Sequence, residues 1–165
     1  MNLRPLSQLP STVASGMHTV FSDIDDTLTT DGQLTPLAYA ALDALRRAGL
    51  RVILITGRPA GWCDHIARMW PVDAVIGENG AFYYWHDHAA HKLKHRHLLS
   101  EAERAANTHK LAAVRDTILR EVPGCAVASD QFCRLYDLAI DFCEDVPALP
   151  QSAIDHIVAL MEAQA

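Results

Sequence analysis

The most informative part of this sequence is residues 18–29, HTVFSDIDDTLT. A short apolar run there breaks into acidic and turn-forming residues, which is typical of a buried strand that ends in a polar loop. Alternate side chains of an extended segment share one face, so Asp23 and Asp25 can point into the same cleft while Ile24 packs behind them. The segment therefore predicts a strand whose carboxyl end delivers two carboxylates to one place.

A helix is predicted directly downstream, over residues 35–49. Thr35 is placed to cap its start, Pro36 is tolerated as the first helical residue, and Gly49 ends it. The apolar face of this helix is predicted to be formed by Leu37, Ala41, Leu45 and Ala48.

The next elements continue the alternation of strand and helix. Residues 51–59, RVILITGRP, form a near-continuous apolar run, as in strands that are buried on both sides of a parallel sheet. A second helix is predicted over residues 61–69, and a short strand over residues 73–80. This alternation predicts an α/β fold in which residues 18–85 form a Rossmann-like parallel sheet core with helices on its faces.

The second half of the chain has a different texture. Residues 86–165 are predicted to form a hairpin and a partial α/β cap module, in which Ser100 and Glu103 make a capping box for a helix that continues to about Arg120. Residues 1–17 are predicted to be a disordered leader. Further elements of the cap are expected as short strands near 126–128 and 134–142 and as a last helix over 152–162.

The composition limits the classes of function. The chain has 165 residues, of which 50% are hydrophobic, and a net charge of −6, which suits one globular core with at most a small inserted module. It lacks the clustered Lys and Arg that nucleic acids or anionic membranes attract, and no apolar run approaches the roughly 18 residues of a membrane span. We therefore expect a cytoplasmic protein that binds neither nucleic acid nor membrane, with its four cysteines reduced.

The two carboxylates suit phosphoryl transfer. One can attack phosphorus and become an acyl phosphate, while the other protonates the leaving oxygen and later activates water. Both repel an anionic substrate, and a bound Mg²⁺ removes that obstacle because it prefers oxygen ligands. Thr56 and the backbone at Gly57 follow the second strand, where they can hold the transferring phosphoryl oxygens.

The motifs resemble those of the haloacid dehalogenase (HAD) superfamily of phosphatases. DIDDTLT at residues 23–29 is similar to its first motif, DxDxTL, and the Thr56 of LITGR is similar to its second. GENGA at residues 77–81 and RLYDLAIDF at residues 134–142 resemble the sugar phosphatase branch with the Cof-like, sucrose phosphatase and trehalose phosphatase families, whose α/β cap follows the third core strand.

This resemblance implies a role for each residue. Asp23 would be the nucleophile, Asp25 the general acid and base, and Thr56 the phosphate-binding hydroxyl, with Mg²⁺ held by the Asp23 carboxylate and the Asp25 backbone carbonyl. Asn79 would line the entrance, and Arg134 would belong to the cap. The expected enzyme is a Mg²⁺-dependent phosphatase that hydrolyses a phosphorylated sugar or a similar small phosphate monoester through an aspartyl phosphate.

The sequence also departs from the resemblance. The superfamily has a catalytic Lys after the cap and a further acidic motif, and neither is found here, so the chain resembles a version truncated within the cap. The first strand would then be an uncovered sheet edge, through which a second copy of the chain can pair. Two other functions remain open, a catalytically impaired remnant that binds a phosphorylated ligand or a protein partner, and a phosphotransferase or mutase.

Several residues also have a simpler interpretation. A DxD pair alone is equally typical of a solvated acidic turn, and Arg58 can steady its loop or contact substrate. Asn79 can be a turn residue beside Gly80. A hairpin can gather imidazoles into a zinc site, but exposed polar hairpins commonly have the same pattern; the histidines concerned are His86, His88, His91, His95 and His97.

Overall fold

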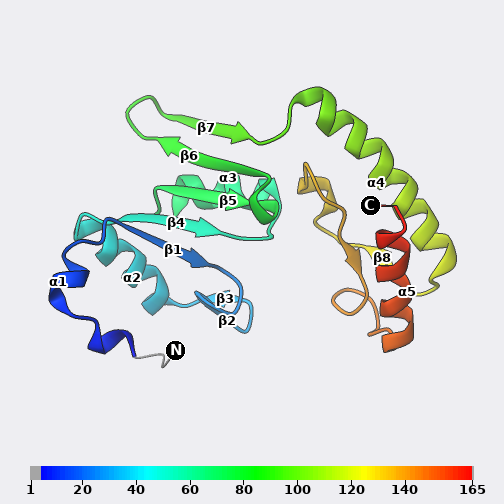
Figure 1. Cartoon of the computed structure of the whole chain (residues 1–165), viewed down its shortest axis with the longest axis horizontal. Coiled ribbons are helices and arrows are strands. Elements are labelled where there is room, and N and C mark those ends of the chain that lie inside the picture. The colour runs from blue at the N-terminus through cyan, green and yellow to red at the C-terminus, as the bar shows by residue number, and fades with distance from the viewer. Residues whose placement is uncertain (1–4, 165) are drawn as a thin grey trace.

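The computed structural model describes residues 5–164 and confirms a mixed α/β fold with a mostly parallel central sheet. The sheet has five strands in the order β1-β4-β5-β6-β7 (Figure 1). Strands β1, β4 and β5 are parallel, whereas β6 and β7 continue the sheet as an antiparallel hairpin. The strands are β1 (Thr19–Asp23), β4 (Arg51–Ile55), β5 (Ala74–Gly77), β6 (Phe82–Asp87) and β7 (Lys92–His97).

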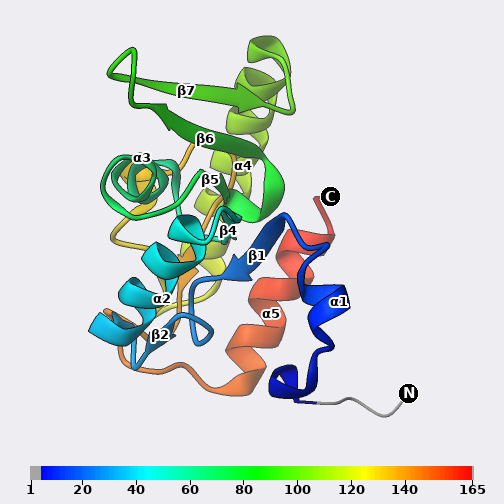
Figure 2. The ribbon, with the colours of Figure 1, turned by 90° about the vertical axis from the view of Figure 1, so that its left-hand side faces the viewer.

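Two helices cover one face of this sheet (Figure 2). Helix α2 (Pro36–Arg47) is capped by Thr35, whose side chain accepts a hydrogen bond from the Ala38 N–H, and helix α3 (Ala60–Met69) follows β4. Apolar side chains of both helices and of the strands form the main core, which contains Leu42, Val52, Leu54, Cys63, Ile66, Val75 and Phe82. This burial fixes the strands whose ends carry the polar loops.

The predicted apolar face of α2 was wrong. Leu37 is 80% exposed, and Leu42 is the buried residue of this helix, with Leu45 packed partly against the core. Apolar residues lie on more than one side of α2, so their spacing alone did not identify the side that meets the sheet.

The other face of the sheet and the edge at β1 are less covered. Phe21 on β1 is 59% exposed, and Ile55 and Tyr83 on the same side of the sheet are also exposed. In the part of the chain that the structure describes, β1 is hydrogen-bonded to β4 alone. The pairing of this edge with a second copy stays a prediction.

The second half forms a smaller layer with its own core (Figure 1). Helix α4 (Glu101–Glu121) has the predicted capping box of Ser100 and Glu103. It packs against α5 (Gln151–Glu162). The short antiparallel strands β8 (Ala126–Val127) and β9 (Ile140–Asp141) lie between the two helices in the sequence. The small core of this layer, which we call the cap, contains Val114, Ile118, Val122 and Ile157.

Two boundaries differ from the sequence prediction. Residues 92–97 belong to the core sheet as β7, whereas the whole segment 86–165 was assigned to the hairpin and cap. The strand predicted over residues 134–142 is limited to β9, and a 3₁₀ helix at Gln131–Cys133 precedes an irregular segment.

The amino-terminal segment contains short helical turns. Of the predicted disordered leader, residues 1–4 lie outside the described residues, and residues 5–17 contain a 3₁₀ helix at Leu6–Gln8 and the four-residue helix α1 (Ser11–Ala14). Between residues 5 and 164, no helix is both long enough and apolar enough to span a membrane.

Candidate active site

The acidic loop after β1 is a tight turn anchored by Ile24. The Ile24 side chain is buried in the main core, and its carbonyl accepts hydrogen bonds from the N–H groups of Leu28 at 2.9 Å and Thr29 at 3.0 Å. Thr29 begins the small hairpin of β2 (Thr29–Thr30) and β3 (Gln33–Leu34), and its hydroxyl accepts a hydrogen bond from the Asp26 N–H. The turn thus exposes the carboxylates that flank Ile24 while its own backbone groups are satisfied.

Asp23 lies at the carboxyl edge of the sheet and faces solvent. It is the last residue of β1 and pairs in register with Ile55, the last residue of β4. Its carboxylate accepts one hydrogen bond, from the Thr27 hydroxyl at 3.2 Å. Because Thr56 follows Ile55 directly, the register places Asp23 and Thr56 at the ends of neighbouring strands.

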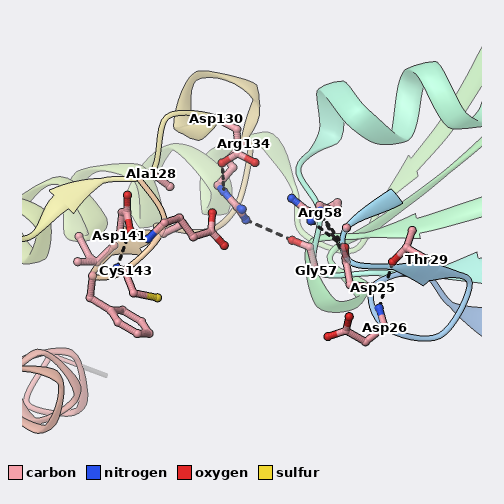
Figure 3. Close-up of a pocket in the computed structure, with 15 residues that line it drawn as sticks. Asp25, Asp26, Thr29, Gly57, Arg58, Ala128, Asp130, Arg134, Asp141 and Cys143 are labelled. Carbon is pink, nitrogen blue, oxygen red and sulfur yellow. Dashed lines mark hydrogen bonds and ion pairs between the residues drawn. The ribbon is translucent and has the colours of Figure 1, made fainter. Parts of the chain in front are cut away.

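Asp25 forms an ion pair with Arg58 across the cleft margin (Figure 3). The guanidinium donates from Nε to both carboxylate oxygens, at 3.2 and 3.1 Å, and from Nη2 to Oδ1 at 2.7 Å. The hydrogen bond with Asp25 raises the pKa of Arg58, so this side chain is cationic at every physiological pH. Arg58 also lies over the Trp62 ring, 4.6 Å from its centroid.

Thr56 and Asn79 support the loop that carries Arg58. Thr56 is only 2% exposed, and its hydroxyl accepts a hydrogen bond from the Arg58 N–H at 3.0 Å. The Asn79 N–H donates to the Thr56 carbonyl at 3.2 Å. A Cβ added to Gly57 would lie 3.1 Å from the Asn79 Oδ1, so the side chain of Asn79 packs close over the Gly57 backbone.

A cleft of about 500 Å³ separates the core from the cap (Figure 3). Its core side is lined by Asp25, Asp26, Gly57 and Arg58, and its cap side by residues of the segments 128–134 and 139–144. The structure therefore brings Asp25, Gly57, Arg58 and Arg134 to one cleft. Asp23 and Thr56 lie within two residues of this lining in the chain, and the Asn79 side chain packs over Gly57, but none of the three lines the cleft.

Arg134 is the link from the cap to this loop. Its guanidinium donates to Asp137 at 3.0 and 3.1 Å, to Asp130 at 3.4 Å and to the Gly57 carbonyl at 3.2 Å. Burial lowers the pKa of Arg134, but the two carboxylates outweigh it and the pKa is raised overall. Arg134 therefore stays charged while it joins the two sides of the cleft.

Asp141 shapes the cap wall. Its carboxylate is buried and accepts hydrogen bonds from the N–H groups of Cys143 at 2.9 Å, Glu144 at 2.8 Å and Asp145 at 2.8 Å. These bonds, that from Glu144 first, hold the pKa of Asp141 below its usual range. Asp141 thus holds the loop that presents Glu144 to the cleft.

The acidic loop offers oxygen ligands of the type that Mg²⁺ prefers. The Asp23 carboxylate and the Asp25 backbone carbonyl are the hard ligands that Mg²⁺ takes, and this ion commonly completes its shell with waters and substrate phosphate. Within residues 5–164, no three side chains of His, Cys, Asp or Glu are grouped to hold a metal ion by themselves. This includes the hairpin histidines, of which His86 and His88 lie with their Nδ1 atoms 3.2 Å apart.

One residue at this interface was missed in the sequence. Glu78 lies within the GENGA motif, from which the sequence predicts only Asn79 as a site residue. The Glu78 carboxylate is 4% exposed and accepts hydrogen bonds from backbone groups of both the core and the cap. A local pattern does not reveal these bonds, since their donors lie 18 and 57–59 residues away.

Comparisons with known proteins agree with this architecture. A family model described as haloacid dehalogenase-like hydrolase matches residues 20–117, more than half of the chain. The fold is similar to that of the Thermoplasma acidophilum protein 0175, with a TM-score of 0.67 and 15% identity over 90% of this chain and 58% of that one. It is also similar to Plasmodium falciparum IMP-nucleotidase, with a TM-score of 0.60 and 9% identity over 91% of this chain and 42% of that one.

The chain thus spans less than two thirds of the length of either solved structure, and at these identities the likeness concerns the fold alone. None of the curated proteins matches the chain.

Proposed function

Since the chain belongs to the haloacid dehalogenase-like hydrolase family, we propose that it hydrolyses small phosphate monoesters, with Asp23 as the nucleophile. The observation that carries this proposal is the position of Asp23. Its carboxylate is exposed at the carboxyl edge of a parallel sheet, where open α/β folds bind ligands, and it is engaged by a single hydroxyl. An aspartyl phosphate formed there would then be hydrolysed by water.

Asp25 is the proposed general acid and base. It follows the nucleophile by two residues, and its carboxylate lines the cleft, where it can protonate a leaving oxygen. Both of its oxygens accept hydrogen bonds from Arg58. An arriving phosphate offers Arg58 another anionic partner, so we expect the guanidinium to turn toward phosphate as Asp25 takes up its catalytic role.

The charge of the cleft favours a role for Mg²⁺. Its lining carries five carboxylates and two guanidinium groups, a net charge of −3. Each guanidinium is already paired with at least one carboxylate. A bound Mg²⁺, held by the Asp23 carboxylate and the Asp25 backbone carbonyl, would supply positive charge that offsets repulsion of the substrate.

A phosphorylated sugar or a similar small polar metabolite is the proposed substrate. The cap wall presents the carboxylates of Asp130 and Glu144 to the cleft, and carboxylates accept hydrogen bonds from hydroxyl groups. A space of about 500 Å³ is of the size that small-molecule sites have. The two arginines, Arg58 and Arg134, lie near the phosphate-binding end of this proposed site.

A comparison of Asp23→Asn with the unchanged chain tests the nucleophile. Phosphate release from an aryl phosphate with Mg²⁺ is expected to fall by at least about 10³-fold, because the carboxamide cannot form the acyl phosphate. Asp31→Asn is the matched control, since Asp31 is an exposed aspartate with a φ of 51° in the nearby hairpin turn, where Asn is well tolerated. Equal activity of Asp23→Asn and the unchanged chain would rule out Asp23 as nucleophile.

A second candidate is binding of a phosphorylated ligand without turnover. The observation that favours it is that, of the described residues that line the cleft, none is a lysine, and both arginines are already engaged by carboxylates. Saturable binding of a sugar phosphate with no release that depends on Asp23 would support this candidate. Transfer of the phosphoryl group to a sugar acceptor in preference to water would instead indicate a phosphotransferase or mutase.

A further inference from the structure

Glu78 is a buried carboxylate whose partners are backbone N–H groups. Buried charges are normally paired with a cation or saturated with hydrogen bonds, because desolvation of an isolated charge is very costly. None of the ion pairs among residues 5–164 involves Glu78. Its carboxylate is instead saturated by four N–H groups, those of Ala60, Leu135, Tyr136 and Asp137.

These donors come from both sides of the cleft. On the core side, the N–H of Ala60, the first residue of α3, donates to Oε1 at 3.0 Å. On the cap side, the N–H groups of Leu135 and Tyr136 donate at 2.9 Å to Oε1 and at 2.6 Å to Oε2. The carboxylate thus receives one bond from the positive end of a helix and the others from the cap.

The turn that carries Glu78 is itself fixed to the candidate active site. The Glu78 N–H donates to the Arg58 carbonyl, and the Asn79 N–H donates to the Thr56 carbonyl, both at 3.2 Å. Asn79 has a φ of 56°, which Asn tolerates, but Glu78 has a φ of 42°, which is uncommon for a residue other than glycine, Asn or Asp and indicates that its surroundings hold it there. Glu78 is therefore held by the same backbone segment that positions Thr56 and Arg58.

Other core–cap contacts are made by the two residues directly before this bonded segment, Cys133 and Arg134. Arg134, directly before the Glu78-bound N–H groups, reaches the Gly57 carbonyl at 3.2 Å. Cys133 packs so closely on α3 that a Cβ added to Gly61 would lie 2.9 Å from its Sγ. A shift of residues 135–137 would therefore move Arg134 and the cap wall relative to Asp25 and Arg58.

We propose that Glu78 is a positioning residue whose carboxylate fastens cap residues 135–137 to the core and thereby sets the width of the cleft. Glu78 does not line the cleft, so it acts through Arg134 and the cap wall and does not contact substrate. The hydrogen bonds between Glu78 and the cap are evidence for this role that does not depend on the proposed function. Only the expected effect on turnover rests on the proposed phosphatase function.

Hydrogen exchange at individual amides tests the fastening without any substrate. In Glu78→Gln, which keeps the size of the side chain but removes its charge, exchange of the Leu135 and Tyr136 amides is expected to accelerate roughly 10- to 100-fold. Asp141→Asn is the matched control, because Asp141 makes the same kind of bonds within the cap only. It should accelerate exchange at residues 143–145 and leave residues 135–136 unchanged.

A second variant covers the case in which Glu78→Gln does not fold. Glu78→Asp keeps the charge but is one methylene shorter, so it cannot reach Ala60 and the cap at once and should also accelerate exchange at Leu135 and Tyr136. Unchanged exchange at these amides in a folded variant would overturn the proposal. So would equal acceleration in Asp141→Asn, since the protection would then reflect general cap stability.

Turnover gives a separate readout of the consequence. In folded Glu78→Gln, the KM for a sugar phosphate should rise at least about 10-fold, while turnover of a small aryl phosphate at saturation stays within about twofold. If exchange accelerates in Glu78→Gln but the unchanged chain has no phosphatase activity, the proposed function is refuted and the role of Glu78 in fastening the cap stands. If the unchanged chain is active but exchange in Glu78→Gln is unchanged, the role of Glu78 is refuted and the proposed function stands.

Discussion

Replacement of Arg58 by methionine separates a structural ion pair from a functional one. The substitution removes the three hydrogen bonds to Asp25 and the cation over Trp62 but keeps much of the apolar stem. If Arg58 only steadies the loop, its loss will lower stability in proportion to those contacts. If Arg58 also binds the phosphate, activity will fall far more than stability.

The stability cost follows from the exposure of the pair. The side chains of Arg58 and Asp25 are 31% and 41% exposed, so solvent screens their attraction and limits it to about 1 kcal/mol. The contact with Trp62 adds about 0.5–1 kcal/mol. We therefore expect Arg58→Met to lower the free energy of unfolding by about 1–2 kcal/mol, measured by urea denaturation.

The functional cost is expected to be larger. Removal of one preorganised charge partner from a phosphoryl-transfer site commonly costs 10²- to 10³-fold in rate, about 3–4 kcal/mol of transition-state stabilisation. Arg58→Lys keeps the charge and loses the planar fork, so it should recover only part of this activity. The assay is phosphate release at saturating aryl phosphate with Mg²⁺.

The control for Arg58→Met is Arg68→Met in α3, the helix that begins two residues after Arg58. Arg68 pairs with Asp64 on the exposed surface of α3, away from the cleft, so this variant should leave turnover unchanged. The reasoning is refuted if Arg58→Met keeps at least half of the activity, because Arg58 would then be a partner of Asp25 and nothing more.

Two further predictions concern the core. Gly77→Ala should lower the free energy of unfolding by about 3 kcal/mol, because the new Cβ would lie 2.3 Å from Phe82 Cζ. Gly16→Ala is the control and should be nearly neutral, because the nearest atom to its new Cβ lies at 3.6 Å. Thermal unfolding of the two variants tests the difference. Burial raises the pKa of the Cys63 thiol to about 12 and that of Tyr84 to about 12, so the folded state keeps these protons after the unfolded chain begins to lose them. Their contribution to stability is therefore complete below about pH 9 and is lost between pH 9 and 12. In that range the free energy of unfolding falls as the pH rises, and Cys63→Ala should make this fall less steep by up to about 1.4 kcal/mol per pH unit. Urea denaturation at a series of pH values measures the slope.

The sequence predicted the elements whose signals are local. The structure confirms three such elements: the strand that ends at Asp23, the helix cap at Thr35 and the capping box of Ser100 and Glu103. Each depends on residues that are a few positions apart in the sequence. The α/β class followed from the alternation of these elements. Predictions of this kind succeed because the chain satisfies its helix ends and buries its apolar runs with neighbours in the sequence.

The sequence failed where distant groups decide the conformation. The strand predicted over residues 134–142 is broken because the N–H groups of residues 135–137 donate to Glu78 and not to a neighbouring strand. The alternation of residues 23 and 25 predicted that both carboxylates point into one cleft, but only Asp25 lines it, and the partner of Asp25 is Arg58, 33 residues away. The spacing of residues within one helix or strand does not reveal either contact, because the partners are far apart in the sequence.

The pairing of both cleft arginines has a consequence for the kind of anion that this site can select. A ligand that recruits Arg58 must replace Asp25, which offers one negative charge and is already held close by the fold. Arg134 is likewise held by Asp137 and Asp130. A carboxylate or a phosphodiester carries a single negative charge and gains little from this exchange.

A phosphate monoester carries up to two negative charges near neutral pH and presents three terminal oxygens, so it can draw the guanidinium away from Asp25. Under the proposed function, the internal ion pair therefore acts against monoanions before any contact with the rest of the substrate. Because Asp25 is the proposed general acid and base, the same exchange that admits the monoester also frees the group that its hydrolysis requires.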